Sequence, residues 1–296
     1  MIFRAGFVAV TGRPNVGKST LVNALVKSKV AIVSRRPQTT RRTIRGVVNR
    51  PDCQIVFVDS PGFHAGGGRA LNRMLNAGAR QAVLEADAVM LVAEAGNWRA
   101  DDERALSLVR AAARPAVLVL NKTDRIHPRE AMLPLMAEAA GRHEFVAVIP
   151  VAARRGENIE RIPDALAPLL PDSPALFPPD QITDQSLAER AAETVREALI
   201  ERLGQELPYA TYVTIERAEE KGRHLHLDAV IWVARTSQKG IVIGAGGRMA
   251  KAIGTAARKA LEAEHGRPVM LNLRVRERAG WNEDPAILAA LGLGAH

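Results

Sequence analysis

The residues with the clearest chemical meaning form a glycine-rich loop near the N-terminus. Residues 12–19 read Gly-Arg-Pro-Asn-Val-Gly-Lys-Ser and fit the pattern G-x-x-x-x-G-K-[ST] after an apolar run. Such a loop turns backbone N–H groups around a polyphosphate, and the helix that follows adds partial positive charge. Lys18 can reach the β- and γ-phosphates, and the Ser19 hydroxyl can ligate Mg²⁺. The pattern predicts a triphosphate site formed by Gly12, Arg13, Pro14, Asn15, Val16, Gly17, Lys18, Ser19 and Thr20.

Two more polar motifs each end an apolar run. Asp59-Ser60-Pro61-Gly62 follows Ile55–Val58. An aspartate at the carboxyl end of a strand can hold Mg²⁺ through water opposite Ser19. The Gly62 N–H can face the γ-phosphate. We therefore predict that Asp59, Ser60, Pro61 and Gly62 all belong to the nucleotide site.

The second of these motifs, Asn121-Lys122-Thr123-Asp124, ends the run Val117–Leu120. The Asp124 carboxylate can accept from both the N1–H and the 2-amino group of guanine, a pair that adenine lacks. An unpaired buried polar group costs about 1–3 kcal/mol, which selects GTP over ATP by about tenfold or more. Asn121, Lys122 and Asp124 are accordingly predicted to form the base-reading part of the site.

Two segments between these motifs are predicted to respond to the nucleotide. Residues 37–43 read Pro-Gln-Thr-Thr-Arg-Arg-Thr, and a threonine here can complete the Mg²⁺ shell beside γ-phosphate. Spacing alone does not choose between Thr39 and Thr40. Residues 63–68, Phe-His-Ala-Gly-Gly-Gly, are expected to be mobile, and the two segments are the expected switches. His64 is a candidate base, although an ordinary switch-loop side chain is the favoured interpretation.

The elements that must position these motifs alternate along the first half of the chain. Short apolar strands separated by helices indicate parallel pairing, hence an α/β sheet covered by helices on both faces. The predicted strands are Phe7–Thr11, Ile55–Asp59, Ala88–Ala93, Ala116–Leu120 and Phe145–Val151. The predicted helices are 18–27, 70–85, 101–112, 129–140 and 157–170.

A proline-rich stretch, 163–180, divides the chain. It predicts a first domain at 1–172, a semi-rigid linker at 173–185 and a second domain at 186–296. The second domain is expected to begin with a helix whose glutamates at four-residue spacing form a solvated acidic stripe. Its predicted elements are a helix at 186–203, strands at 209–218 and 224–234, a helix at 248–264, a strand at 268–276 and a short C-terminal helix.

The second domain carries its own glycine loop, Gly244-Ala245-Gly246-Gly247, directly before a predicted helix. In KH domains, such a G-x-x-G loop clamps the backbone of single-stranded nucleotides beside an apolar groove. The motif alone is a weak indication, but the strand order matches a type II KH fold. Residues 221–278 also hold 12 Lys and Arg against 4 Asp and Glu, a net charge of +8. The predicted RNA contacts are Lys239, Gly240, Ile243, Gly244, Ala245, Gly246, Gly247, Arg248, Lys251 and Trp281.

Composition narrows the class of protein. The 296 residues are 47% hydrophobic and 25% charged, as in ordinary globular proteins, and the net charge of +9 favours an anionic partner. Cys53 is the single cysteine, which points to a reducing compartment. The first residues lead directly into a predicted strand, and no apolar run approaches the roughly 20 residues of a membrane span. We therefore expect a cytoplasmic protein without a secretory signal.

Taken together, the four motifs resemble the Era family of bacterial GTPases, in the TrmE-Era-EngA-like group, and the likeness extends from the first motif to Trp281. The resemblance implies that Thr40 is the metal-sensing residue and that Asn121, Asp124 and the Ala153 backbone N–H read guanine. Ala152 precedes Ala153 in the same motif and is also predicted to belong to the nucleotide site. The family is described as lacking a catalytic glutamine, and Phe63 occupies that position. No side chain is therefore assigned as catalytic, and we expect slow hydrolysis. Asp59, Gly62 and Phe63 are the residues expected nearest to the reacting phosphate.

The sequence departs from the family pattern at three positions. Ser60 replaces the usual threonine, Ala152 replaces a serine that makes a local hydrogen bond, and Ala245 replaces a loop lysine. The second change predicts weaker nucleotide binding. The third removes a charge that pairs with phosphate, which Lys239, Arg248 and Lys251 are expected to replace.

The resemblance implies a GTP- and Mg²⁺-dependent switch that binds the 3′ end of 16S rRNA and acts in assembly of the 30S subunit, as a monomer. One alternative is a regulatory RNA-binding module whose nucleotide site is structural. Another is a membrane-associated GTPase of cell-cycle control, with peripheral contact to the inner membrane. A GTPase of tRNA modification is a weaker alternative, because the KH-like half argues against it.

Overall fold

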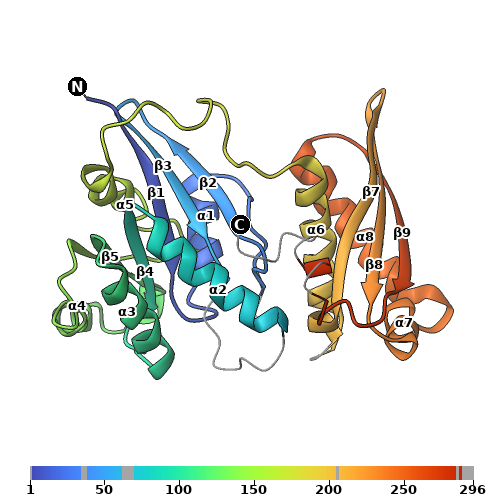
Figure 1. Cartoon of the computed structure of the whole chain (residues 1–296), viewed down its shortest axis with the longest axis horizontal. Helices are drawn as coiled ribbons and strands as arrows, with labels where there is room; N and C mark the ends of the chain where they lie inside the picture. The colour runs from blue at the N-terminus through green and yellow to red at the C-terminus, as the bar shows by residue number, and fades with distance from the viewer. Residues whose placement is uncertain (1, 35–38, 62–69, 205–206, 285–286, 289–296) are drawn as a thin grey trace. The chain divides into compact units, whose positions relative to one another are not determined.

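The structure is a computed structural model that describes residues 2–34, 39–61, 70–204, 207–284 and 287–288. The chain divides into two compact units, and Figure 1 labels most of their helices and strands. The first unit contains residues up to 31 and residues 40–184. The second contains the described residues from 32 to 39 and from 185 onwards.

The first unit is built on a six-stranded sheet with the order β2-β3-β1-β4-β5-β6. Every neighbouring pair is parallel except β2–β3, which is antiparallel. The carboxyl ends of the parallel strands therefore meet along one edge, where open α/β sheets bind their ligands. The strands are β1 (Arg4–Thr11), β2 (Ile44–Asn49), β3 (Cys53–Asp59), β4 (Ala88–Glu94), β5 (Ala116–Asn121) and β6 (Ala147–Pro150).

Helices cover both faces of this sheet because its central strands are apolar on both sides. In β1, Val8 and Val10 pack towards α1 (Lys18–Val26) and α5 (Arg161–Leu166). Ala9 packs into the opposite core. That opposite core includes residues of α2 (Ala70–Glu85), α3 (Ala100–Ala112) and α4 (Met132–Ala140). The predicted two-faced α/β sheet is thus confirmed.

Two details of the first unit differ from the predictions. The edge strand β2 was not predicted, since its sequence, Ile-Arg-Gly-Val-Val-Asn, mixes buried with exposed residues and contains no long apolar run. The helix predicted over 157–170 is shorter, because α5 spans only Arg161–Leu166 and a 3₁₀ turn, Ala167–Leu169, follows it. Pro163 is tolerated in α5 because it lies in the first turn, where no intrahelical N–H bond is lost.

The proline-rich segment is held against the first unit. The Val47 N–H donates to the Ile182 carbonyl at 2.9 Å. The Gln54 side chain accepts from the backbone N–H groups of Leu176 and Phe177 at 2.7 and 2.9 Å. Much of the predicted linker is therefore attached to the edge of this sheet. Amino-acid composition alone does not indicate these contacts.

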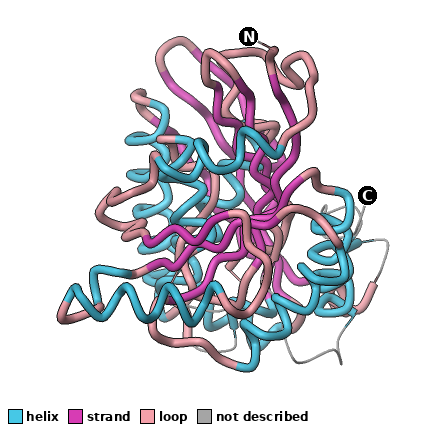
Figure 2. Tube along the Cα trace, turned by 90° about the vertical axis from the view of Figure 1, so that its left-hand side faces the viewer, coloured by secondary structure: helices cyan, strands magenta, loops and turns pink. Residues whose placement is uncertain are grey.

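The second unit is a three-stranded sheet, β7-β8-β9, with β7–β8 antiparallel and β8–β9 parallel. Its elements follow one another in the order α–β–β–α–α–β. Figure 2 colours the helices of the chain cyan and its strands magenta. Apolar residues of α6 and α8 form one core with the sheet. The elements are α6 (Leu187–Arg202), β7 (Thr211–Lys221), β8 (His224–Val233), α7 (Thr236–Ile243), α8 (Arg248–His265) and β9 (Val269–Glu277).

Helix α7 was not predicted. Gly240 lies inside it and β-branched residues follow, a pattern that favours a strand. By contrast, α6 begins where the sequence predicts, because Ser186 and Glu189 form a reciprocal capping box. The predicted C-terminal helix falls largely outside the described residues.

A short segment of the first half of the sequence belongs to the second unit. The Val33 N–H donates to Glu197 Oε1 at 3.0 Å, and the Arg196 guanidinium donates to the Thr39 carbonyl. Arg196 is buried and also pairs with Glu193 at 2.6 Å. The glutamates of α6, predicted as one solvated stripe, are therefore partly engaged in capping and pairing.

Candidate nucleotide site and KH loop

The phosphate loop connects the end of β1 to the start of α1, and two of its glycines are required by close contacts. A Cβ on Gly12, whose φ is 143°, would lie 2.2 Å from the Val92 carbonyl oxygen. A Cβ on Gly17, whose φ is 104°, would lie 2.3 Å from Asn121 Nδ2. The loop can therefore follow this path only without side chains at these positions.

Lys18 occupies the interior of the loop. Its Nζ donates to the carbonyl oxygens of Gly12 and Arg13 at 2.9 and 3.1 Å. Burial lowers the pKa of Lys18 from 10.5 to about 8, against the opposing attraction of Asp59. An ammonium in this position can exchange its carbonyl partners for phosphate oxygens, which would favour its charged form.

The three predicted metal residues come together beside the loop. Ser19 Oγ lies 2.7 Å from Asp59 Oδ2 and 3.0 Å from Thr40 Oγ1. Asp59 is buried, and its Oδ1 has no hydrogen-bond partner among the described residues. Burial raises the pKa of Asp59, with Lys18 opposing the shift. Two hydroxyls and one carboxylate are the oxygen donors that suit Mg²⁺, so these residues fit the ion that the motifs imply.

Asn121 organises the segment that the sequence predicts to read the base. Its Nδ2 donates to the Val16 carbonyl at 2.8 Å, and its Oδ1 accepts from the N–H groups of Lys122 and Ala153 at 2.8 and 3.1 Å. Asp124 follows in a 3₁₀ turn and is partly exposed. This arrangement joins three motifs: the phosphate loop, the Asn-Lys-Thr-Asp motif and the Ala152-Ala153 segment after β6.

The remaining predicted residues of the first unit lie on or beside the loop. Ser60 is buried and its hydroxyl donates to the Val10 carbonyl at 3.4 Å. Pro14 and Asn15 are at the loop tip, Thr20 is in the first turn of α1 and Pro61 follows β3. Gly62, Phe63 and His64 lie outside the described residues.

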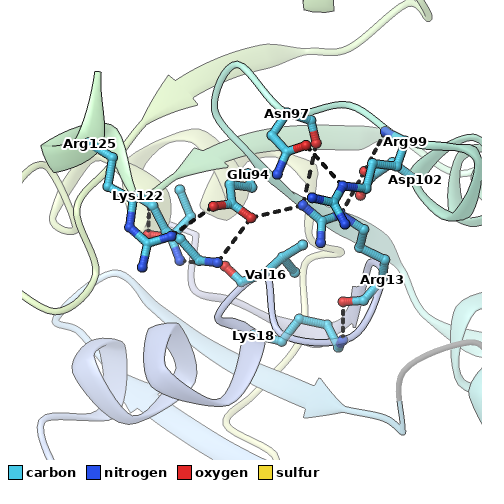
Figure 3. A network of polar contacts seen from close by, with 10 residues as sticks. Arg13, Val16, Lys18, Glu94, Asn97, Arg99, Asp102, Lys122 and Arg125 are labelled. Carbon is cyan, nitrogen blue, oxygen red and sulfur yellow. Dashed lines mark hydrogen bonds and ion pairs between the residues drawn. The ribbon is translucent and has the colours of Figure 1, made fainter. Parts of the chain in front are cut away.

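The sequence patterns missed a charged network next to the phosphate loop (Figure 3). Arg13 Nη2 lies 2.9 Å from Glu94 Oε2, and Arg13 Nε lies 2.8 Å from Asp102 Oδ2. Glu94 also pairs with Lys122 at 3.1 Å and with Arg125 at 2.9 Å. Burial alone would raise the pKa of Glu94, but hydrogen bonds from Lys122 and Arg13 outweigh it and lower the pKa. Glu94 has no motif of its own, so only its position at the end of β4 could have suggested a role.

In the second unit, the glycine loop separates α7 from α8. A Cβ on Gly244 would lie 2.8 Å from Met249 Cβ, whereas Gly246 and Gly247 face open space at φ values of 60° and 76°. The N-terminus of α8 is thus preceded by backbone that a phosphate can approach closely. Ala245, Gly246, Arg248 and Lys251 are exposed, while Lys239 and Gly240 lie on α7 and Ile243 ends it.

The predicted RNA contact of Trp281 is contradicted by its burial. Its side chain is fully buried, with its ring centroid 4.6 Å from that of Tyr212 and its Nε1–H donating to the Ala210 carbonyl at 3.3 Å. A buried ring offers no face to a base. Trp281 is instead a core residue of the second unit.

The comparisons with known proteins agree with this geometry. A family model described as a 50S ribosome-binding GTPase matches residues 7–122, and a KH domain model matches residues 206–282. GTPase Era of Stenotrophomonas maltophilia (strain K279a) is 48% identical over 287 residues, which cover 97% of this chain and 96% of the relative. The Xanthomonas oryzae pv. oryzae protein (strain MAFF 311018) is 48% identical over 289 residues, covering 98% and 97%. The chain belongs to the Era family of GTPases.

Solved structures of the Era family match over nearly the whole chain. A GDP–AlF₄⁻ complex of an Aquifex aeolicus Era variant is 35% identical, with a TM-score of 0.93 and coverage of 99% of this chain and 100% of that one. An Era complex with MgGDPNP and nucleotides 1506–1542 of 16S ribosomal RNA matches with the same TM-score and identity, covering 99% of each chain. The predicted fold class, a phosphate-loop GTPase domain followed by a KH domain, is confirmed.

Within the described part of the chain, we find no helix whose length and apolarity would allow it to cross a membrane.

Proposed function

We propose that this Era-family GTPase binds GTP with Mg²⁺, grips the 3′ region of 16S rRNA through its second unit, and acts in assembly of the 30S subunit. The observation that carries the proposal is the presence of both sites in one chain. Ser19, Thr40 and Asp59 converge beside the phosphate loop, and the Gly244–Gly247 loop precedes the N-terminus of α8. The related Era complex with 16S rRNA supports the choice of RNA.

For the nucleotide, we assign the phosphates to the loop 12–17 and Lys18, and the guanine to Asp124. Asn121 holds the two halves of this site together through the Val16 carbonyl. Ala153 is assigned a backbone contact to the base. Ala152, which is buried and whose N–H donates to the Glu157 carbonyl at 3.2 Å, supports the turn that presents it.

For hydrolysis, Ser19, Thr40 and Asp59 are the residues that would hold Mg²⁺, which when bound neutralises charge that develops on the phosphates. The chain's own residues contribute positioning: the loop backbone and Lys18 fix the phosphates in place. With Phe63 where many GTPases have glutamine, no side chain is assigned as a base, and a slow intrinsic rate is expected.

For the RNA, we assign the backbone of Gly244–Gly247 to the phosphates of single-stranded nucleotides. Arg248 and Lys251, exposed in the first turn of α8, supply the positive charge that Ala245 does not. Lys239 on α7 adds a further charge, and Ile243 at the end of α7 lines the apolar side of the loop.

We further propose a cytoplasmic monomer. Contact with the surface of the inner membrane, and a role in cell-cycle control, remain the alternative that the basic net charge of +9 allows. A regulatory RNA-binding module with a structural nucleotide site is the second alternative.

Ultraviolet crosslinking of the full chain to total RNA, with a non-hydrolysable GTP analogue or with GDP, tests the proposal. The expected product is 16S rRNA, enriched with the GTP analogue. Recovery of no preferred RNA contradicts it. Single-turnover GTP hydrolysis with and without 30S subunits separates the proposal from the alternative with a structural nucleotide site, because such a site hydrolyses no GTP in either condition.

A further inference from the structure

One carboxylate touches both halves of the nucleotide site. Glu94 ends β4, the strand that lies between β1, which leads into the phosphate loop, and β5, which leads into the base-reading segment. Its Oε2 forms ion pairs with Arg13 Nη2 at 2.9 Å and with Lys122 Nζ at 3.1 Å. Because Arg13 belongs to the phosphate loop and Lys122 to the Asn-Lys-Thr-Asp motif, Glu94 joins the two (Figure 3).

A second carboxylate touches only one half. Asp102, near the start of α3, is fully buried, and its Oδ2 accepts from Arg13 Nε at 2.8 Å and from the Arg99 N–H at 2.9 Å. The Arg99 contact is part of the cap of α3. Asp102 therefore anchors Arg13 to a rigid helix but makes no recorded contact with the base-reading segment among the described residues.

The backbone of Arg13 shows what such an anchor controls. Its carbonyl accepts from Lys18 Nζ, so the position of Arg13 fixes part of the surroundings of the phosphate-binding ammonium. The Arg13 side chain is only 9% exposed, held by Glu94 and Asp102. Buried ion pairs rarely add much stability over apolar packing, because desolvation offsets their attraction. A role in geometry therefore explains this network better than a role in stability.

We propose that Glu94 is a positioning residue that keeps the phosphate loop and the guanine-reading segment in register, and that Asp102 positions the phosphate loop alone. The inference rests on the proposed nucleotide site. If Glu94 positions both segments, its loss should impair recognition of the base as well as binding of the phosphates. A merely structural role does not predict the effect on the base.

Calorimetric affinities for GDP and IDP test the distinction, because IDP lacks the 2-amino group that Asp124 is assigned to read. Glu94→Gln should lower GDP affinity by about tenfold and also lower the GDP-to-IDP affinity ratio by about threefold. Asp102→Asn should lower the affinities for GDP and for IDP by the same factor. Glu103→Gln, which changes the neighbouring exposed carboxylate of α3, is the matched control and should alter neither affinity.

Equal losses of GDP and IDP affinity in Glu94→Gln, or no loss, would overturn the inference. If unmodified protein shows no preference for GDP over IDP, the proposed function fails instead, so the two failures are distinguishable. Urea melts report whether each variant folds. If the Glu94→Gln protein does not fold, Glu94→Asp is the second variant. It keeps the charge but shortens the reach to Arg13 and Lys122. It must lower the GDP-to-IDP ratio for the inference to stand.

Discussion

Asn121 Nδ2 donates to the Val16 carbonyl at 2.8 Å, a hydrogen bond between residues 105 positions apart that ties the base-reading segment to the phosphate loop. Asn121→Asp keeps the oxygen that accepts from Lys122 and Ala153 but replaces the donor with an anionic oxygen facing a carbonyl. Losing a buried pairing of this kind costs about 1–3 kcal/mol, so GDP affinity should fall by about tenfold or more. Calorimetry measures the change.

The control for this substitution is Asn97→Asp, whose side-chain oxygen accepts from Arg99 Nε at 2.9 Å and can continue to do so as a carboxylate. It should leave GDP affinity within about twofold of the unmodified protein. An Asn121→Asp protein that binds GDP as tightly as this control would show that the link to Val16 is dispensable.

Guanine selectivity depends on Asp124 in our assignment. Asp124→Asn turns one acceptor of the carboxylate into a donor, which clashes with the guanine 2-amino group but suits the 2-oxo group of xanthine. GDP affinity should fall by about tenfold or more, and XDP affinity should rise. Competition binding with GDP, XDP and ADP measures both. Unchanged GDP affinity would mean that another residue reads the base.

The metal assignment predicts how Mg²⁺ and nucleotide affinity are coupled. Ser19→Ala removes the hydroxyl that lies 2.7 Å from Asp59 and 3.0 Å from Thr40. The increase in GDP affinity that Mg²⁺ produces should shrink by about tenfold, while affinity in EDTA should stay within about twofold. An equal loss with and without Mg²⁺ would instead indicate a role for Ser19 in holding the loop.

The glycine loop of the second unit offers a matched pair of substitutions. Gly246 and Gly266 have φ values of 60° and 63°, and a Cβ on either meets nothing within 4 Å. Gly246→Asp and Gly266→Asp therefore impose similar backbone strain and the same charge, one in the loop and one at the end of α8. Only Gly246→Asp should abolish binding to 16S rRNA fragments in a mobility-shift assay.

Nucleotide affinity should be unchanged in both glycine variants. If Gly266→Asp weakens RNA binding as much as Gly246→Asp, the loss comes from strain or net charge, and the loop assignment fails.

Trp281 should matter for stability and not for RNA contact. Removing this buried indole by Trp281→Ala should cost about 3–5 kcal/mol in the free energy of unfolding of the second unit. Urea melts followed by circular dichroism measure the loss, and RNA affinity is compared where the variant is folded. A fully stable Trp281→Ala protein that cannot bind RNA would restore Trp281 as an RNA contact.

The sequence was sufficient for features whose partners are close along the chain or whose strands are strongly apolar. The phosphate loop, Asp59 and Asn121-Lys122-Thr123-Asp124 were located because each follows a buried strand that ends at the same edge of the sheet. The meeting of Ser19, Thr40 and Asp59 follows from that shared edge, and the structure shows it.

Other features depended on contacts that no local pattern contains. Glu94 looks like any strand-end carboxylate, since Arg13 is 81 positions away. No local sequence pattern predicts that Trp281 packs against Tyr212, because the two residues are far apart along the chain. Helix α7 contains Gly240 and β-branched residues, and only tertiary packing of the buried Val242 against the core outweighs that local preference.

The proposed function couples GTP binding to RNA binding in one chain. The direct measurement is the affinity of the full chain for an RNA fragment from the 3′ end of 16S rRNA, at one fixed salt concentration, with a non-hydrolysable GTP analogue or with GDP bound. We expect the RNA to bind about tenfold more tightly with the GTP analogue than with GDP, which is a typical coupling between two sites of one protein. Equal RNA affinity in the two nucleotide states would contradict it.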